Sequence, residues 1–124
     1  MSRGYRQLLV YRRSMDVVDR CVALTHDLPI DERFELSSQI RRASVSIPAN
    51  IAEGYARQTT GSYVYHLRVA RGSATELEVL LEVADRNYFG RQGRCDDLID
   101  EVGQIAAMIT AIIRKLTEAN ESTP

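Results

Sequence analysis

Apolar residues recur every three or four positions in four separate segments of the chain, which is the spacing of one face of an α-helix. The pattern predicts helices over about residues 5–27, 32–57, 62–88 and 94–118. No segment alternates as a strand would, and the connections between the segments are short. We therefore expect an all-α fold, an antiparallel up-down-up-down four-helix bundle in which residues 1–124 form a single domain.

Helix-breaking and capping residues mark where these segments end. Asp31 is the expected N-cap of the second helix, and the turn at 58–62 carries hydroxyl caps for the third. Pro48 lies inside the second helix, where we expect a bend but continued helix. The third helix should end at two glycines, Gly90 and Gly93.

A second, polar line runs beside the apolar face of the second helix. Its members are spaced by 3, 4, 4, 3 and 4 residues: Gln39, Arg42, Ser46, Asn50, Glu53 and Arg57. Ser46 and Asn50 are mediocre helix formers, and alanines thin the neighbouring faces, so an ordinary solvated face explains the line poorly. We predict a partly buried hydrogen-bonded network, within the bundle or between subunits, formed by Gln39, Arg42, Ser46, Asn50 and Glu53 with Arg68 and Glu76 of the third helix. Gly72 indicates close helix contact nearby.

The overall composition is that of a soluble globular protein, with 44% hydrophobic and 27% charged residues. A net charge of −1 counts against a dedicated nucleic-acid binder. The charge is unevenly distributed, however: residues 1–71 hold 11 Arg against 7 acids, and residues 72–124 hold 5 basic against 10 acidic residues. An exposed basic rim is one interpretation, formed by Arg12, Arg13, Arg41, Arg57 and Arg71. Salt bridges to the equally numerous acids are the interpretation that we favour.

The sequence offers little for catalysis or cofactor binding. Cys21 and Cys95 lack zinc or redox spacing and should be buried, reduced thiols. His26 and His66 do not fall in the Glu-x-x-His pattern of di-iron bundles, and no phosphate-binding or nucleophile motif occurs. We predict no metal, no cofactor, no small-molecule substrate and no enzymatic activity.

One enzymatic alternative stays open, in which Glu53 and Glu76 act as an acid/base pair in a common pocket. We favour carboxylates bound by arginines instead. The N-terminal segment lacks the apolar core of a signal peptide, and the longest apolar run, within residues 105–113, is too short to span a bilayer. The expected location is the cytoplasm, without membrane association.

Three motifs in the second and third helices are more specific than this general pattern. They are QIRRA at 39–43, SIPANIAEG at 46–54 and ARGS at 70–73, and the segment that contains them resembles the four-helix bundle proteins called 23S rRNA intervening-sequence proteins. The resemblance implies a four-helix protomer that assembles as a ring-shaped homopentamer, with no established enzymatic activity. A related accessory protein of diversity-generating retroelements is a pentamer thought to bind nucleic acid and reverse transcriptase. The resulting expectation is a homo-oligomeric binding or scaffold module whose partners are other copies of itself and RNA or a nucleoprotein.

Overall fold

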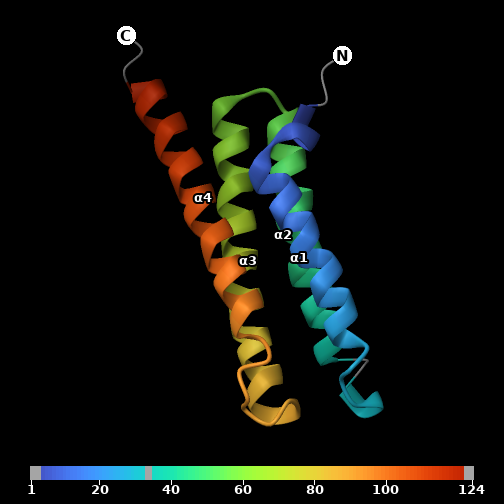
Figure 1. Cartoon of the computed structure of the whole chain (residues 1–124). Helices are drawn as coiled ribbons and strands as arrows, with labels where there is room; N and C mark the ends of the chain where they lie inside the picture. The colour runs from blue at the N-terminus through green and yellow to red at the C-terminus, as the bar shows by residue number, and fades with distance from the viewer. Residues whose placement is uncertain (1–3, 33–34, 122–124) are drawn as a thin grey trace.

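The computed structural model describes residues 4–32 and 35–121 as a bundle of helices (Figure 1). Four α-helices form it: α1 (Leu9–Thr25), α2 (Leu36–Ala56), α3 (Thr60–Tyr88) and α4 (Asp96–Glu121). Two short 3-10 helices, η1 (Gly4–Gln7) and η2 (Ile30–Glu32), precede α1 and α2. Within these ranges there is no strand, which confirms the all-α prediction.

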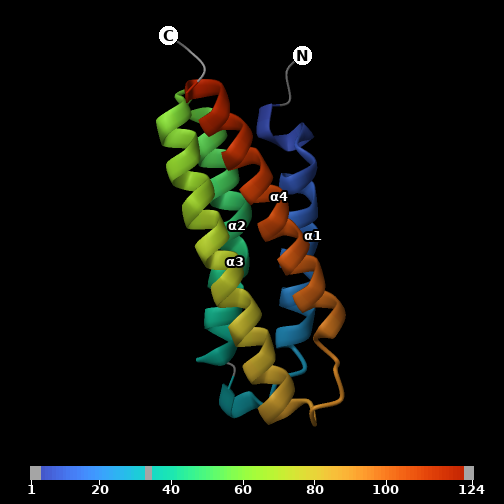
Figure 2. The same cartoon turned by 90° about the vertical axis from the view of Figure 1, so that its left-hand side faces the viewer.

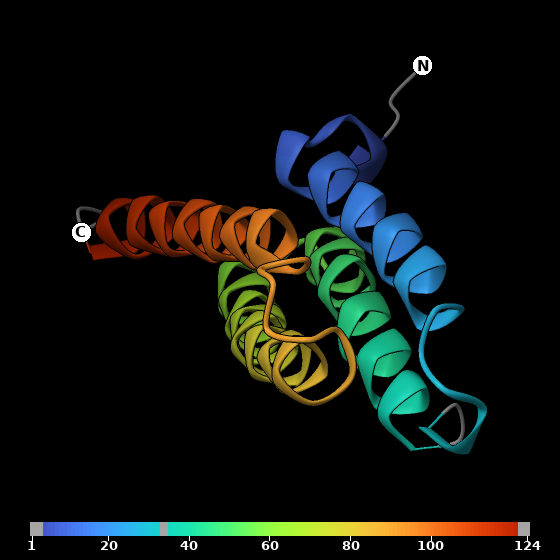
Figure 3. The ribbon, with the colours of Figure 1, turned by 60° about the horizontal axis from the view of Figure 1, so that its bottom comes forward.

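The connections alternate between the two ends of the molecule. Figures 1 and 2 show the start of α1, the α2–α3 turn and the last turn of α4 at one end, and the α1–α2 and α3–α4 connections at the other. Helix α2 packs against both α1 and α3, and α4 packs against α3, whereas α1 and α4 meet less extensively (Figure 3). The α2–α3 pair is thus the most tightly associated part of the fold.

The core lies along the apolar lines that the periodicity marks. Apart from Thr25, the largest fully buried side chains are aliphatic and come from all four helices: Val10, Val17, Ile40, Ile47, Ile51, Leu67, Leu77, Leu81, Val102, Ile105 and Ile109. Burying one such side chain stabilises the fold by about 1.5–3 kcal/mol. Alanines of α3 that continue its apolar line, Ala70, Ala74 and Ala84, are also fully buried and let the neighbouring helices approach.

The helix ends follow the sequence signals in part. The Thr59 side chain accepts a 3.3 Å hydrogen bond from the Ser62 N–H at the start of α3, and Gly90 and Gly93 adopt φ of 72° and 74° beyond its end. The expected N-cap at Asp31 is wrong, because Asp31 lies in η2 and α2 begins only at Leu36. Helix α2 continues through Pro48, as expected.

None of the helices in the described part of the chain combines the length and the apolar character needed to cross a membrane.

Candidate interaction site along the α2–α3 seam

The predicted polar line of α2 lies where α2 meets α3, and we call this boundary the α2–α3 seam. The Ser46 and Ser73 hydroxyl oxygens are 2.7 Å apart and share a hydrogen bond. The Asn50 amide nitrogen donates to the Ser46 carbonyl at 2.9 Å and lies 3.1 Å from its hydroxyl. The Asn50 amide oxygen then faces His66, and Nδ1 of His66 lies 3.1 Å from it. Because an amide oxygen only accepts hydrogen bonds, Nδ1 is the donor. Part of the predicted network therefore forms within one chain.

The charged end of the seam is more exposed. Glu53 accepts a 2.9 Å hydrogen bond from Arg57 one turn along α2, and its carboxylate lies 4.0 Å from Nε2 of His66. The Arg57 hydrogen bond, followed by the nearby His66, holds the pKa of Glu53 below its ordinary value. The Glu53 side chain is 52% exposed, so this pair contributes little to stability.

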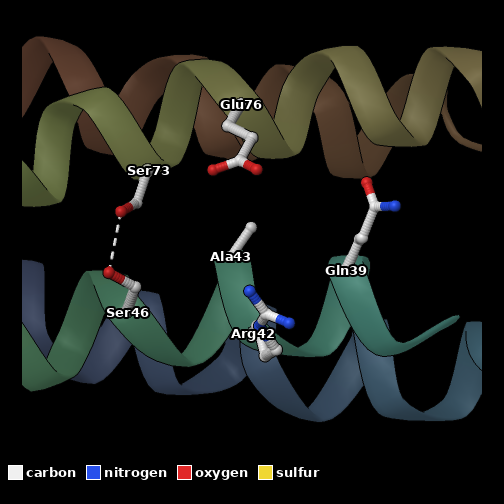
Figure 4. Close-up of a pocket in the computed structure, with 6 residues that line it drawn as sticks. All are labelled: Gln39, Arg42, Ala43, Ser46, Ser73 and Glu76. Carbon is white, nitrogen blue, oxygen red and sulfur yellow. Dashed lines mark hydrogen bonds between the residues drawn. The ribbon is translucent and has the colours of Figure 1, made fainter. Parts of the chain in front are cut away.

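The opposite end of the seam opens into a polar cavity of about 260 Å³, lined by Gln39, Arg42, Ala43, Ser46, Ser73 and Glu76. Figure 4 shows the Gln39 side chain extending from α2 and the Glu76 carboxylate extending from α3 toward the same space. Among the described residues, the side chains of Gln39, Arg42 and Glu76 have no hydrogen-bond or ion-pair partner. A guanidinium, an amide and a carboxylate are thus free to bind something outside the chain.

Close approach of α2 and α3 is possible because of a glycine at the far end of the seam. A Cβ added at Gly54 would lie 2.7 Å from Cβ of His66 and 3.1 Å from the Tyr63 ring. The contact expected from the sequence at Gly72 does not occur between residues 4–32 and 35–121, because a Cβ added there would meet nothing within 4 Å.

The residues of the proposed basic rim have different surroundings. Arg13 reaches α4, where its Nε donates to Glu101 at 2.9 Å and its Nη2 donates to Gln104 at 2.7 Å. Arg71 donates to Thr110 at 3.2 Å, and Arg57 binds Glu53 as described. Arg12, Arg41 and Arg68 are exposed, and Arg41 donates to the Thr25 hydroxyl at 3.3 Å. Four of the five rim arginines, Arg13, Arg41, Arg57 and Arg71, are therefore already hydrogen-bonded to other parts of the chain.

The two carboxylates of the enzymatic alternative are not brought together. Glu76 borders the polar cavity, whereas Glu53 is not among the residues that line it. Both cysteines are free, buried thiols, as expected. Burial raises the pKa of Cys21 to about 12 and that of Cys95 to about 11. In the described ranges, no group of three or more His, Cys, Asp or Glu side chains is placed to hold a metal ion.

Sequence reasoning missed the place of His66 in the seam, and it did not pair Ser73 of α3 with Ser46. The signal that identifies them is the turn at 57–59, because a short turn fixes which positions of two neighbouring helices meet. A residue later in α2 therefore contacts a residue earlier in α3. Ser46 contacts Ser73, and Asn50 contacts His66.

The model of the 23S rRNA-intervening sequence proteins matches residues 6–111, a range that includes α1, α2, α3 and most of α4. The chain belongs to the 23S rRNA-intervening sequence protein family. A crystal structure described as a protein of unknown function from the S23 ribosomal protein family, from Bacteroides thetaiotaomicron, is similar to this family member, with 28% identity and a TM-score of 0.76. The similarity covers 85% of this chain and 98% of that one. Comparison with curated proteins gave no match.

Proposed function

We propose that this chain is the protomer of a homo-oligomer, an up-down-up-down four-helix bundle that assembles as a homopentamer and acts as a non-enzymatic scaffold or binding module. The observation that carries the proposal is the polar cavity of the α2–α3 seam. It presents Gln39, Arg42 and Glu76 without partners among the described residues, inside the range that matches the family.

The cavity has the properties of a recognition surface. Arg42 and Glu76 project from two helices that are packed firmly together, so neither backbone has to become ordered when a partner arrives. Opposite charges at such a surface select the partner and its register more than they add affinity. A second copy of the chain supplies both charges, and so can satisfy both.

The proposed absence of catalysis has physical support in the titratable groups. A general acid at neutral pH needs a raised carboxyl pKa, whereas the pKa of Glu53 is lowered, mainly by Arg57. A thiol nucleophile needs a lowered pKa, whereas burial raises the pKa of both cysteines.

RNA is the proposed cargo of the assembled scaffold, and the support for it comes from Arg57 of the basic rim. The Arg57 side chain is 57% exposed and its partner Glu53 is 52% exposed, so the pair is weak and a phosphate can compete for the guanidinium group. An Arg57→Glu variant that still assembles should lose RNA retention in a filter-binding assay at low salt. Retention equal to that of the unaltered chain would reject RNA binding by this residue.

The assembly proposal is tested by removing the unpaired groups of the cavity. Arg42→Ala and Glu76→Ala should shift the protein toward the mass of a single chain in light scattering, at concentrations where the unaltered chain is assembled. Arg86→Ala is the matched control, because Arg86 is an exposed arginine that is paired with Glu82 on its own helix. If the cavity variants keep the full mass, the seam does not organise the assembly.

A further inference from the structure

The outward side of α3 carries an apolar line that the core does not use. Val69, Val79 and Val83 are 37%, 55% and 39% exposed, and they are spaced with Gly72 and Glu76 at intervals of three and four residues. We call these five residues the α3 stripe. Valine is β-branched and lowers helix propensity, and at an exposed position it gains no burial in return. The packing of a single four-helix bundle therefore gives no reason for these valines.

Gly72 is the least expected member of the α3 stripe. It lies in the middle of α3, where glycine is, after proline, the poorest helix former. A Cβ at this position would meet nothing within 4 Å, so no neighbour in the described part of the chain requires a glycine there. A helix that must be approached closely from outside does require one, since a missing Cβ lets another backbone come near.

A matching concave surface lies between α1 and α2. This α1–α2 groove has a volume of about 260 Å³, and its lining includes Tyr5, Tyr11, Met15, Val45, Ala49 and Ala52. Met15 and Val45 are 39% and 48% exposed, and the two alanines leave room for a ridge from outside. The α1–α2 groove and the α3 stripe share no residue, so one copy can use both surfaces at once.

The charges indicate that the occupant of the groove is a second copy. Arg12 and Arg41 are exposed beside the groove, one residue after Tyr11 and one turn before Val45. The stripe contains Glu76, whose carboxylate has no hydrogen-bond or ion-pair partner among the described residues. The stripe therefore presents one carboxylate between valines, and Arg12 and Arg41 present two guanidinium groups beside an apolar floor.

We propose that the α3 stripe of one copy docks in the α1–α2 groove of the next, head to tail, with Gly72 at the point of closest approach. The inference rests on the proposed homo-oligomer and names its contact surfaces. Two different surfaces that pair repeatedly generate a ring when the rotation closes, whereas a self-complementary patch stops at a dimer.

The test uses two variants, each of which disrupts one surface, and then a mixture of the two. Val79→Glu damages only the stripe and Met15→Glu only the groove, and both changes are at exposed positions that a folded bundle tolerates. Each variant alone should have the mass of a single chain in light scattering. A mixture should form pairs, because the Met15→Glu copy keeps an intact stripe and the Val79→Glu copy keeps an intact groove. Val22→Glu is the control, since Val22 is an exposed α1 valine outside both surfaces and should leave the assembly unchanged.

The outcomes separate this inference from the proposed function. If the unaltered protein is a monomer in solution, both the proposed homo-oligomer and this inference are overturned. An assembly of more than two chains that survives Val79→Glu or Met15→Glu overturns the choice of surfaces and leaves the oligomer standing. An unaltered chain that stops at two copies overturns the head-to-tail arrangement.

The close approach at Gly72 has its own matched pair of variants. Gly61 is also an α3 glycine with open space at its Cβ position, and it lies outside the stripe. Gly72→Ala should weaken assembly by about tenfold or more, and Gly61→Ala should leave it unchanged. Circular dichroism establishes that both variants are folded. Equal assembly of the two variants would remove Gly72 from the contact.

Discussion

The contact between α2 and α3 at Gly54 gives a prediction whose sign opposes ordinary helix propensity. Replacing a glycine in a helix by alanine normally stabilises it by about 1 kcal/mol. At Gly54, however, the new Cβ would lie 2.7 Å from Cβ of His66, 3.1 Å from the Tyr63 ring and 3.3 Å from the Tyr63 carbonyl oxygen. The carbonyl and the Cβ are fixed to the backbone of α3, so only a displacement of that helix relieves the clash.

The magnitude follows from these two opposing effects. Overpacking of a well-packed site costs about 1–3 kcal/mol, and the gain in helix propensity offsets about 1 kcal/mol of it. We expect Gly54→Ala to lower the free energy of unfolding by about 1–2 kcal/mol. The displacement should also lengthen the 3.1 Å contact between His66 and Asn50 and so disturb the seam.

Urea unfolding followed by circular dichroism measures this change. The variants must be compared at one protein concentration, because assembly contributes to apparent stability. Gly61→Ala is the control, since its Cβ enters open space and no loss of stability is expected. If Gly54→Ala proves as stable as the unaltered chain or more so, close packing at the seam is not what requires a glycine there.

Two further predictions concern titratable groups. The Arg13 hydrogen bond holds the pKa of Glu101 below its ordinary value of 4.5. The pair therefore stabilises the fold fully above pH 4.5, and its contribution is lost as the pH falls through the lower pKa of the folded state. Glu101→Gln should therefore lower the free energy of unfolding by about 1 kcal/mol near pH 7, with the difference shrinking in acid, and a difference that stays constant in acid would contradict this. Because burial raises the pKa of Cys21 to about 12 and that of Cys95 to about 11, both thiols should react with a disulfide reagent at about pH 8 only after unfolding, and rapid labelling of the folded chain would contradict their burial.

The core could be predicted from the sequence because burial follows periodicity directly. Ile40, Ile47 and Ile51 are fully buried where their spacing places them, and α3 residues at intervals of three and four are fully buried in the same way: Leu67, Ala70, Ala74, Leu77, Leu81 and Ala84. Helix beginnings were harder to predict. A candidate N-cap such as Asp31 is only one of several local hydrogen-bonding options, and a 3-10 turn includes that residue instead.

Only the α2 side of the candidate site could be predicted from the sequence. The α2 residues of the seam form a helical line, but their partners His66 and Ser73 depend on which α3 positions face α2. Arg13 shows the same limit. Its spacing gives no sign that α4 presents Glu101 and Gln104 to it, and its role follows from packing between helices that are far apart in the sequence. Spacing identifies a face, whereas the partner of each residue depends on the assembled fold.

The most direct test of the central claim is the absolute molar mass of the unaltered chain in solution, measured by light scattering at several protein concentrations. The account predicts the mass of a homopentamer that falls toward that of a single chain only on strong dilution. A single-chain mass at all concentrations would contradict it, because the cavity of the α2–α3 seam and the α3 stripe would then have no second copy to bind.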